Sequence, residues 1–331
     1  MPKFTRSIYY TSTVACLGIL LAVSLLITFI HKPGSAVATG SQPFAINVTS
    51  SPYNATCDGS TDDTSAFTSA LAAFPSTGGR LLVPASANLC KITSTLVVPD
   101  NVIIEGESRA ASVIWCDFSS GPCLQFGNTS RTSSTETMNG GVEHLGLEGN
   151  SKSNSGTSGV NFFAAQGGFV NDVQVQFVES GFVINGGPSG AFSAEETFTA
   201  PYTNNVVNGI KTTASGGITT DFHCCTGGYL FGTSSHDTGD AFSLNSLNSS
   251  YLTQWSMEGF NYGIHLTGND EADTFNGGRS EHMGSDNGTH SYVCDSSTDV
   301  DGLFDNLTDA DVDEANQVNM TVSNSAECNM N

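Results

Sequence analysis

The sequence predicts an all-β fold made of many short strands, preceded by one short helix. From residue 145 onward, apolar and polar residues alternate in short runs that Gly, Asn and Ser separate, which is typical of strands joined by turns. In the C-terminal half similar residues recur every 22 to 23 positions, as at Leu244 and Leu266 and at Leu252 and Phe275. Such repeats fit the coils of a solenoid. Pairs such as Asn139-Gly140 still allow the hairpins of an antiparallel sandwich.

The helix is expected over residues 64–74. Asp62 and Asp63 can accept hydrogen bonds from the free N–H groups of its first turn, and Pro75 ends it. One face is apolar and consists of Ala66, Phe67, Ala70, Leu71 and Phe74. Short strands are expected after it at 81–84, 94–98 and 101–105.

Residues 54–108 carry turn, helix and strand motifs in a distinctive order. In sequence they are Asp58-Gly59, Asp62-Asp63-Thr64, the amphipathic helix, Gly78-Gly79, a strand ending at Pro84, and Gly106-Glu107. This order resembles the opening of the pectate-lyase-like superfamily, including its rhamnogalacturonase and epimerase-like branch and many phage tailspikes. The departures are Tyr53-Asn54-Ala55, where that family has Tyr-Gly-Ala, and the stretch 84–88, which lacks the Pro-x-Gly-x-Tyr motif. The resemblance implies a right-handed parallel β-helix with a short N-terminal capping helix. It also implies a carbohydrate-directed activity whose substrate is an extracellular polysaccharide.

Residues 1–40 are predicted to be a targeting segment. A basic N-terminus precedes an uncharged apolar run over 14–30, and Ala36-Val37-Ala38 offers a cleavage site. The run is long for a signal-peptide core and slightly short for a full membrane span. We therefore expect either a cleaved signal peptide or a signal anchor with a short linker. Both would place residues 41–331 outside the cytoplasm as a single β-helix domain, with an acidic C-terminal end at 295–331.

The cysteines support export. Cys16 lies in the apolar run, which leaves eight of the nine cysteines for up to four disulfides. Cys57 with Cys90, and Cys116 with Cys123, are the expected pairs because each would close a short local loop. A zinc site is the weaker alternative because the sequence contains no Cys-x-x-Cys.

The charge balance limits the partners. Ten Lys and Arg residues stand against 32 Asp and Glu residues, giving a net charge of −22. Such a surface argues against nucleic acid and anionic membranes, so contact with a membrane is expected only through the N-terminal segment. A polyuronate would also be repelled unless Ca²⁺ bridged it. No cofactor is expected. The Asp-rich end at 295–331 matches no complete calcium motif, so a looser Ca²⁺ site there is the alternative to a solvated terminus, which explains this stretch better.

The candidate catalytic residues are acidic. Asp237, Glu258 and Glu281 are spaced by 21 and 23 positions, so they could project from one face of three successive coils. Asp240 is an alternate for the first position. Paired carboxylates can supply the acid and the base or nucleophile of glycan hydrolysis. The candidate substrate-binding residues around them are His236, Trp255, Tyr262, His265, Arg279 and His282.

Structural roles are open for the same residues. Asp237 and Asp240 could close turns, Arg279 could pair with Glu281, and Trp255 could belong to the core. The expected function is a glycoside hydrolase acting on polysaccharide. A pectate-type lyase is the enzyme alternative, although basic residues for its proton abstraction are scarce. The third alternative is a non-catalytic glycan-binding, tailspike-like or adhesin-like β-helix, for which a homotrimer is conceivable.

Overall fold

The computed structural model describes residues 44–127, 137–187, 192–213, 221–235, 239–267, 269–281, 292–294, 299–305, 308–309, 320–322 and 327–330. The predicted targeting segment lies outside these residues, as do His236, Asp237 and His282. Within the described part of the chain, no helix is long and apolar enough to cross a membrane.

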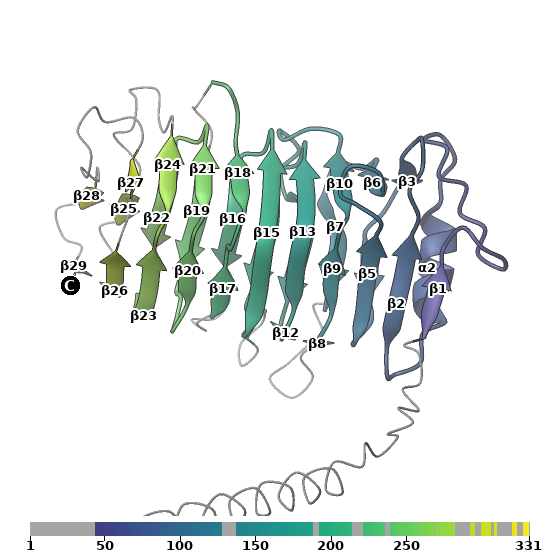
Figure 1. The fold of residues 1–331 in the computed structure, drawn as a ribbon, viewed down its shortest axis with the longest axis horizontal. Helices are drawn as coiled ribbons and strands as arrows, with labels where there is room; N and C mark the ends of the chain where they lie inside the picture. The colour runs from purple at the N-terminus through teal and green to yellow at the C-terminus, as the bar shows by residue number, and fades with distance from the viewer. Residues whose placement is uncertain are drawn as a thin grey trace, which may run out of the picture. The chain divides into compact units, whose positions relative to one another are not determined.

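Residues 44–331 form one compact unit, a solenoid of parallel strands (Figure 1). A complete coil contributes one strand to a smaller sheet and either two short strands or one long strand to a larger sheet. Each strand pairs in parallel with the corresponding strand of the next coil. The parallel pairing overturns the antiparallel alternative and confirms the β-helix expectation.

The strands of the larger sheet are β1 (Ala45–Asn47), β2 (Gly79–Val83), β3 (Cys90–Ile92), β5 (Val102–Gly106), β6 (Val113–Cys116), β9 (Gly141–Glu143), β10 (Gly146–Gly149), β13 (Phe169–Gln176), β15 (Glu196–Asn204), β17 (Phe222–Cys224), β18 (Tyr229–Phe231), β20 (Tyr251–Thr253), β21 (Ser256–Glu258), β23 (Asn269–Asn276), β24 (Arg279–Glu281), β26 (Asp299–Asp305), β27 (Thr308–Asp309) and β29 (Glu327–Met330). The smaller sheet contains β4 (Leu96–Val98), β7 (Gly121–Phe126), β11 (Thr157–Phe163), β14 (Ser180–Asn185), β16 (Asn208–Thr213), β19 (Asp240–Asn245), β22 (Tyr262–Thr267), β25 (Tyr292–Cys294) and β28 (Met320–Val322). A two-stranded sheet joins β8 (Thr137–Met138) to β12 (Ala165–Gln166).

The register confirms the three C-terminal repeat pairs that the sequence predicts. They are Leu244 with Leu266, Leu252 with Phe275, and Glu258 with Glu281. The repeat is longer in the middle of the solenoid, where Gln174 pairs with Tyr202 and Tyr202 pairs with Tyr229. The interval of the three C-terminal pairs therefore does not extend along the whole chain.

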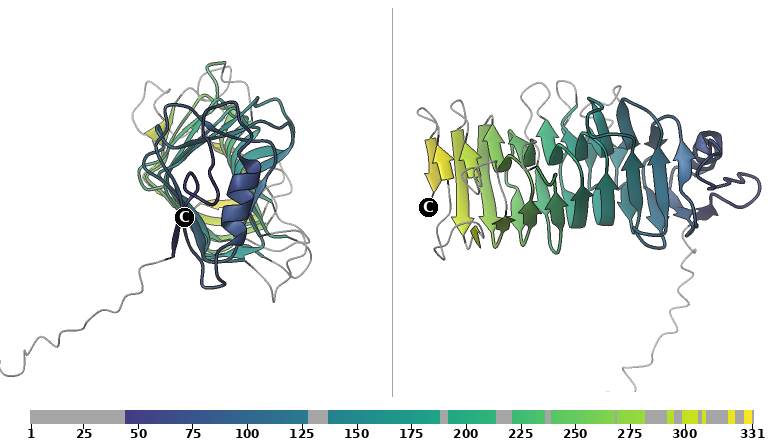
Figure 2. Two further views of the ribbon diagram at one scale, coloured as in Figure 1. Left: turned by 90° about the vertical axis from the view of Figure 1, so that its right-hand side faces the viewer. Right: turned by 90° about the horizontal axis from the view of Figure 1, so that it is seen from above.

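The helix α2 (Thr64–Ala72) lies across the N-terminal end of the coils (Figure 2). It ends two residues earlier than expected, and it buries Phe67, Ala70 and Leu71. These three residues belong to the apolar face that the sequence predicts, and their burial explains why a nine-residue helix is stable here, since a short isolated helix is marginal in water.

The two acidic residues before α2 have different roles. The Asp62 carboxylate accepts a hydrogen bond from the Thr64 N–H at 3.0 Å, as predicted. Asp63 occupies the N-cap position but makes no side-chain bond to the helix. Its carboxylate instead accepts hydrogen bonds from the N–H groups of Thr56 and Cys57 at 2.6 and 2.9 Å, so it fixes the preceding turn. The expectation that Asp63 caps the helix with its carboxylate is wrong.

Both predicted disulfides are present. Cys57–Cys90 ties the turn before α2 to β3, and Cys116–Cys123 joins the end of β6 to β7. A third disulfide links the adjacent residues Cys224 and Cys225 at the end of β17, a pairing that the sequence did not suggest.

Aromatic side chains stack through the core. Phe126 lies 5.0 Å from Phe162 between ring centroids, and Phe162 lies 5.9 Å from Phe198. Phe198 also contacts Phe182 and Phe222, at 5.6 and 5.9 Å. All five are fully buried, so successive coils hold each other through one continuous aromatic stack.

Glu196, at the start of β15, is a carboxyl group inside the solenoid. It is fully buried, and this burial raises its pKa well above the usual range, with the nearby Asp221 carboxylate acting in the same direction. Above the ordinary Glu pKa of about 4.3, the unfolded chain loses the proton while the folded chain keeps it. The free energy of unfolding should therefore fall by about 1.4 kcal/mol per pH unit until the raised pKa is reached.

We expect Glu196→Gln to remove this pH dependence. Urea unfolding of the two proteins between about pH 5 and pH 7 measures the difference. The matched control is Glu195→Gln at the exposed neighbouring residue, which should keep the wild-type slope. Parallel pH profiles for the wild type and Glu196→Gln would contradict the prediction.

Candidate functional site

The larger sheet presents two rows of side chains to solvent. In successive coils one strand position of this sheet is always buried. The buried residues are Ile114, Leu147, Val175, Thr203, Leu230 and Met257. Because side chains alternate along a strand, the residues immediately before and after each of these point outward. We call the first outward set the outer row, and it consists of Lys91, Trp115, Glu148, Gln176, Asn204, Phe231 and Glu258. The second row contains Val113, Gly146, Gln174, Tyr202, Tyr229, Ser256 and Arg279. Together they form an outward face that mixes carboxylates, amides and aromatic rings.

Glu258 ends the outer row on β21. The Tyr229 hydroxyl donates a hydrogen bond to its Oε2. Glu281 on β24 is its register partner in the next coil. Parallel strands lie about 4.8 Å apart, so the structure brings two of the four predicted catalytic residues to neighbouring positions.

The expected row of three carboxylates does not form. The register partner of Glu258 in the preceding coil is Phe231. Phe231 precedes Asp237 in the sequence, so this coil is longer than the interval from Asp237 to Glu258. Asp237, which lies outside the described residues, is therefore not that partner.

Asp240 lies elsewhere. It is on β19 in the smaller sheet, because it precedes Glu258 by less than one coil. Its Oδ2 lies 3.1 Å from the Nδ1 of His265, whose ring centroid is 5.2 Å from that of Tyr262. His265 and Tyr262, both predicted to bind substrate, therefore lie near Asp240 on the smaller sheet and not with Glu258 on the larger sheet.

Trp255 is a core residue. Its side chain is 2% exposed and packs edge-on against Phe242 and Phe275. Gly278 lies so close that a β-carbon there would be 1.8 Å from the indole. Trp255 is therefore unavailable for stacking on a sugar. Among the predicted binding residues that the structure describes, only the exposed Arg279 shares the face with Glu258.

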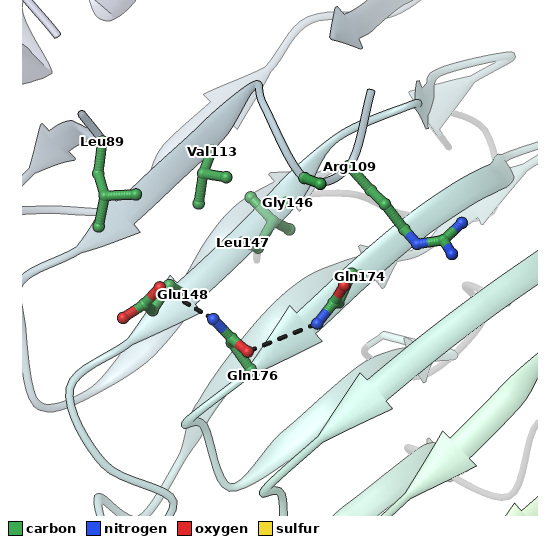
Figure 3. A pocket seen from close by; sticks show the side chains of 9 residues that line it. Leu89, Arg109, Val113, Gly146, Leu147, Glu148, Gln174 and Gln176 are labelled. Carbon is green, nitrogen blue, oxygen red and sulfur yellow. Dashed lines mark hydrogen bonds between the residues drawn. The ribbon is translucent and has the colours of Figure 1, made fainter. Parts of the chain in front are cut away.

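The sequence did not reveal a cavity of about 320 Å³ at the N-terminal part of this face (Figure 3). The Gln176 amide donates to Glu148 Oε2 at 2.9 Å, and the Gln174 amide donates to Gln176 at 3.5 Å. The cavity is lined by Leu89, Arg109, Ala110, Val113, Gly146, Leu147, Glu148, Gln174 and Gln176.

An ionic cluster adjoins the cavity. The Arg109 guanidinium lies 3.7 Å above the Tyr202 ring and pairs with Asp172. The second Asp172 oxygen lies 3.2 Å from His144 Nδ1. Arg109 and Asp172 are far apart in the sequence, in coils of unequal length. The 22- to 23-residue interval of the C-terminal half does not align the residues of this cluster in the sequence. Their proximity follows only from the strand register of the folded chain.

Cations elsewhere on the larger sheet are also paired with carboxylates. Arg80 bridges the register partners Glu105 and Glu143, and hydrogen bonding to Glu143 raises the pKa of its guanidinium. Lys91 pairs with Asp117 at 2.6 Å, and this contact lowers the pKa of that carboxyl.

Solved structures with the same architecture are distant in sequence. ORF18 of Geobacillus virus E2 is 16% identical with a TM-score of 0.52, over 92% of this chain and 52% of that one. The tailspike of E. coli bacteriophage HK620, a mutant solved with a hexasaccharide, is 11% identical with a TM-score of 0.59, over 80% and 51%. The DFA-IIIase of Arthrobacter chlorophenolicus A6, solved with GF2, is 9% identical with a TM-score of 0.58, over 85% and 92%.

The chain spans about half the length of the two phage proteins. Neither a protein-family model nor a curated protein sequence matches it. The likeness at these identities concerns the fold, and it agrees with the parallel register and with the motif order at residues 54–108. The chain has a right-handed parallel β-helix fold.

Proposed function

We propose that this protein binds a glycan along the two outward rows of the larger sheet and hydrolyses it at Glu258 and Glu281. The observation that carries the proposal is the register pairing of these two glutamates on neighbouring strands, with Glu258 on the outward face beside Tyr229. Retaining glycosidases hold their two carboxyl groups about 5–5.5 Å apart, and inverting ones about 6.5–9.5 Å. The strand spacing of about 4.8 Å favours the retaining arrangement.

The roles follow from the contacts of Glu258. As an acceptor of the Tyr229 hydroxyl, Glu258 is oriented to act as the nucleophile. It attacks the anomeric carbon while Glu281 protonates the departing glycosidic oxygen, so that bond breaks and a glycosyl ester forms. Glu281 then removes a proton from water, which displaces Glu258 and restores both groups.

Aromatic rings on the same face support sugar binding. The rings of Tyr229 and Phe231 are stacked, with centroids 6.3 Å apart and planes inclined by 17°, so they form an aromatic pair next to Glu258. Tyr202 is the register partner of Tyr229 in the preceding coil, and the Arg109 guanidinium covers one face of its ring. Sugar rings stack their C–H faces on such surfaces and hydrogen-bond to amides. The disulfides support an extracellular location, since disulfides persist in oxidising compartments.

A second candidate is a glycan-binding β-helix without catalysis. The pairing of Arg80, Lys91 and Arg109 with carboxylates favours it, because a purely structural face would neutralise its acidic side chains in this way. Glu258 favours the first candidate, because its carboxylate lies on the outward face and accepts a hydrogen bond from the Tyr229 hydroxyl.

The test is reducing-sugar release by the full chain over a panel of neutral and acidic polysaccharides, with ultraviolet absorbance of unsaturated uronides measured in the same wells. Hydrolysis is expected to release reducing ends without unsaturated product. Unsaturated product would replace the proposal with a lyase. Retention on a polysaccharide gel without any release would replace it with the binding role.

A further inference from the structure

We infer that the 320 Å³ cavity beside Glu148 is a subsite for one neutral hexopyranose ring, which anchors the glycan at a fixed distance from Glu258. The role as an anchor rests on the proposed function, whereas the binding of a sugar ring does not. The size, polarity, charge and position of the cavity each support this assignment.

The size fits a single ring. Ligand sites span about 300–1,000 Å³, so this cavity is at the lower limit. The segment 107–111 closes one side, because Gly146 lets the Arg109 carbonyl come close; a β-carbon at Gly146 would lie 2.5 Å from that oxygen. The segment is held by hydrogen bonds from Gly146 N–H to Ser112 O and from Ser86 N–H to Ala111 O, so this wall is preformed.

The polar side chains of the cavity form a chain of hydrogen bonds in which each amide donates to the next residue. Gln174 donates to Gln176, and Gln176 donates to Glu148, which fixes both amides in orientation (Figure 3). Each carboxamide has two N–H donors and a carbonyl acceptor. A sugar hydroxyl both donates and accepts, so it can bond to this chain, while Leu89 and Val113 offer apolar contact to the C–H groups of the ring.

The charges favour a neutral ring. Glu148 contributes a carboxylate to the cavity. Arg109 is directed away from Glu148, over Tyr202 and toward Asp172 (Figure 3). The carboxylate of a uronate in the cavity would therefore be repelled by the Glu148 carboxylate. The Arg109 guanidinium is already paired with Asp172, so it would not offset this repulsion.

The position links the cavity to the proposed catalytic pair. From Glu148 the outer row continues through Gln176, Asn204 and Phe231 to Glu258. Four strand steps of about 4.8 Å place these two glutamates about 19 Å apart along the solenoid. One strand step is close to the length of one sugar in an extended glycan. A ring held in the cavity would therefore set the length of the fragment that is released.

The two tryptophans of the chain provide the readout. Trp115 is the outer-row neighbour of Glu148, whereas Trp255 is buried in the core. The full chain is labelled with 5-fluorotryptophan, and Trp115→Phe assigns the two fluorine resonances. Glucose, galactose, mannose and N-acetylglucosamine are titrated, with glucuronate as the charged comparison. At least one neutral sugar should shift the Trp115 resonance saturably in the millimolar range and leave the Trp255 resonance in place.

Gln176→Leu should weaken this binding by about tenfold, because it removes the central amide of the chain. Gln125→Leu makes the same change on an outward position of the smaller sheet and should have no effect. The subsite is overturned if no neutral sugar shifts Trp115, if glucuronate binds best, or if the two variants behave alike. Glycan cleavage with a silent Trp115 would reject the subsite alone, and a responsive Trp115 without cleavage would reject only the hydrolase.

Discussion

Glu258→Gln is expected to reduce the rate of glycan hydrolysis by at least about 10³-fold. Glutamine keeps the size of the side chain and can still accept a hydrogen bond from Tyr229, but it cannot attack the anomeric carbon. The measurement is kcat on the polysaccharide that the panel identifies. Circular dichroism and the unfolding midpoint should match the wild type, because Glu258 lies on the outward face and not in the core.

Two further variants separate chemistry from structure. In Glu258→Ala, added azide should restore turnover and yield a glycosyl azide, since a small nucleophile can occupy the vacated space. Glu195→Gln, which neutralises an exposed glutamate before β15, should retain full activity. A Glu258→Gln protein that keeps more than about a tenth of the wild-type rate would contradict the assignment, because loss of a catalytic acid, base or nucleophile removes about 10² or more.

Phe198→Ala is expected to lower the free energy of unfolding by about 3–5 kcal/mol. Phe198 is 1% exposed and contacts Phe162, Phe182 and Phe222, so its truncation opens a cavity where several coils meet. Urea denaturation followed by circular dichroism measures the change.

The control is Phe198→Leu, which keeps most of the volume and should lose about 1.5 kcal/mol or less. A similar loss in both variants would mean that ring stacking, and not filled volume, holds this region. A loss below about 1 kcal/mol for Phe198→Ala would show that the aromatic stack does not carry the coil contacts, since most core truncations of this size exceed it.

Local chemistry made the N-terminal region predictable. The apolar face of α2, the Asp62 contact to Thr64, and the two short-range disulfides each depend on residues close in sequence or on simple loop closure. The motif order at 54–108 then separated the parallel solenoid from the sandwich. Alternation located many strands, because each inward residue must be apolar to fill the core.

The site was harder to predict because outward residues are not constrained by packing. The sequence paired Glu258 with Glu281 correctly, since no long insertion separates β21 from β24. One coil earlier it chose Asp237 where the register has Phe231, because the coil there is longer than the C-terminal repeats. Asp240 was assigned to the wrong sheet for the same reason, and the cavity beside Glu148 left no periodic signal at all.

The position of α2 also affects how the molecule can associate with copies of itself. A parallel solenoid ends in strands whose outer N–H and C=O groups have no partner within the chain, and such edges template the pairing of further strands. At the N-terminal end, α2 lies across the first coil with Phe67, Ala70 and Leu71 turned inward. The helix is thus a steric block against end-to-end polymerisation from that side.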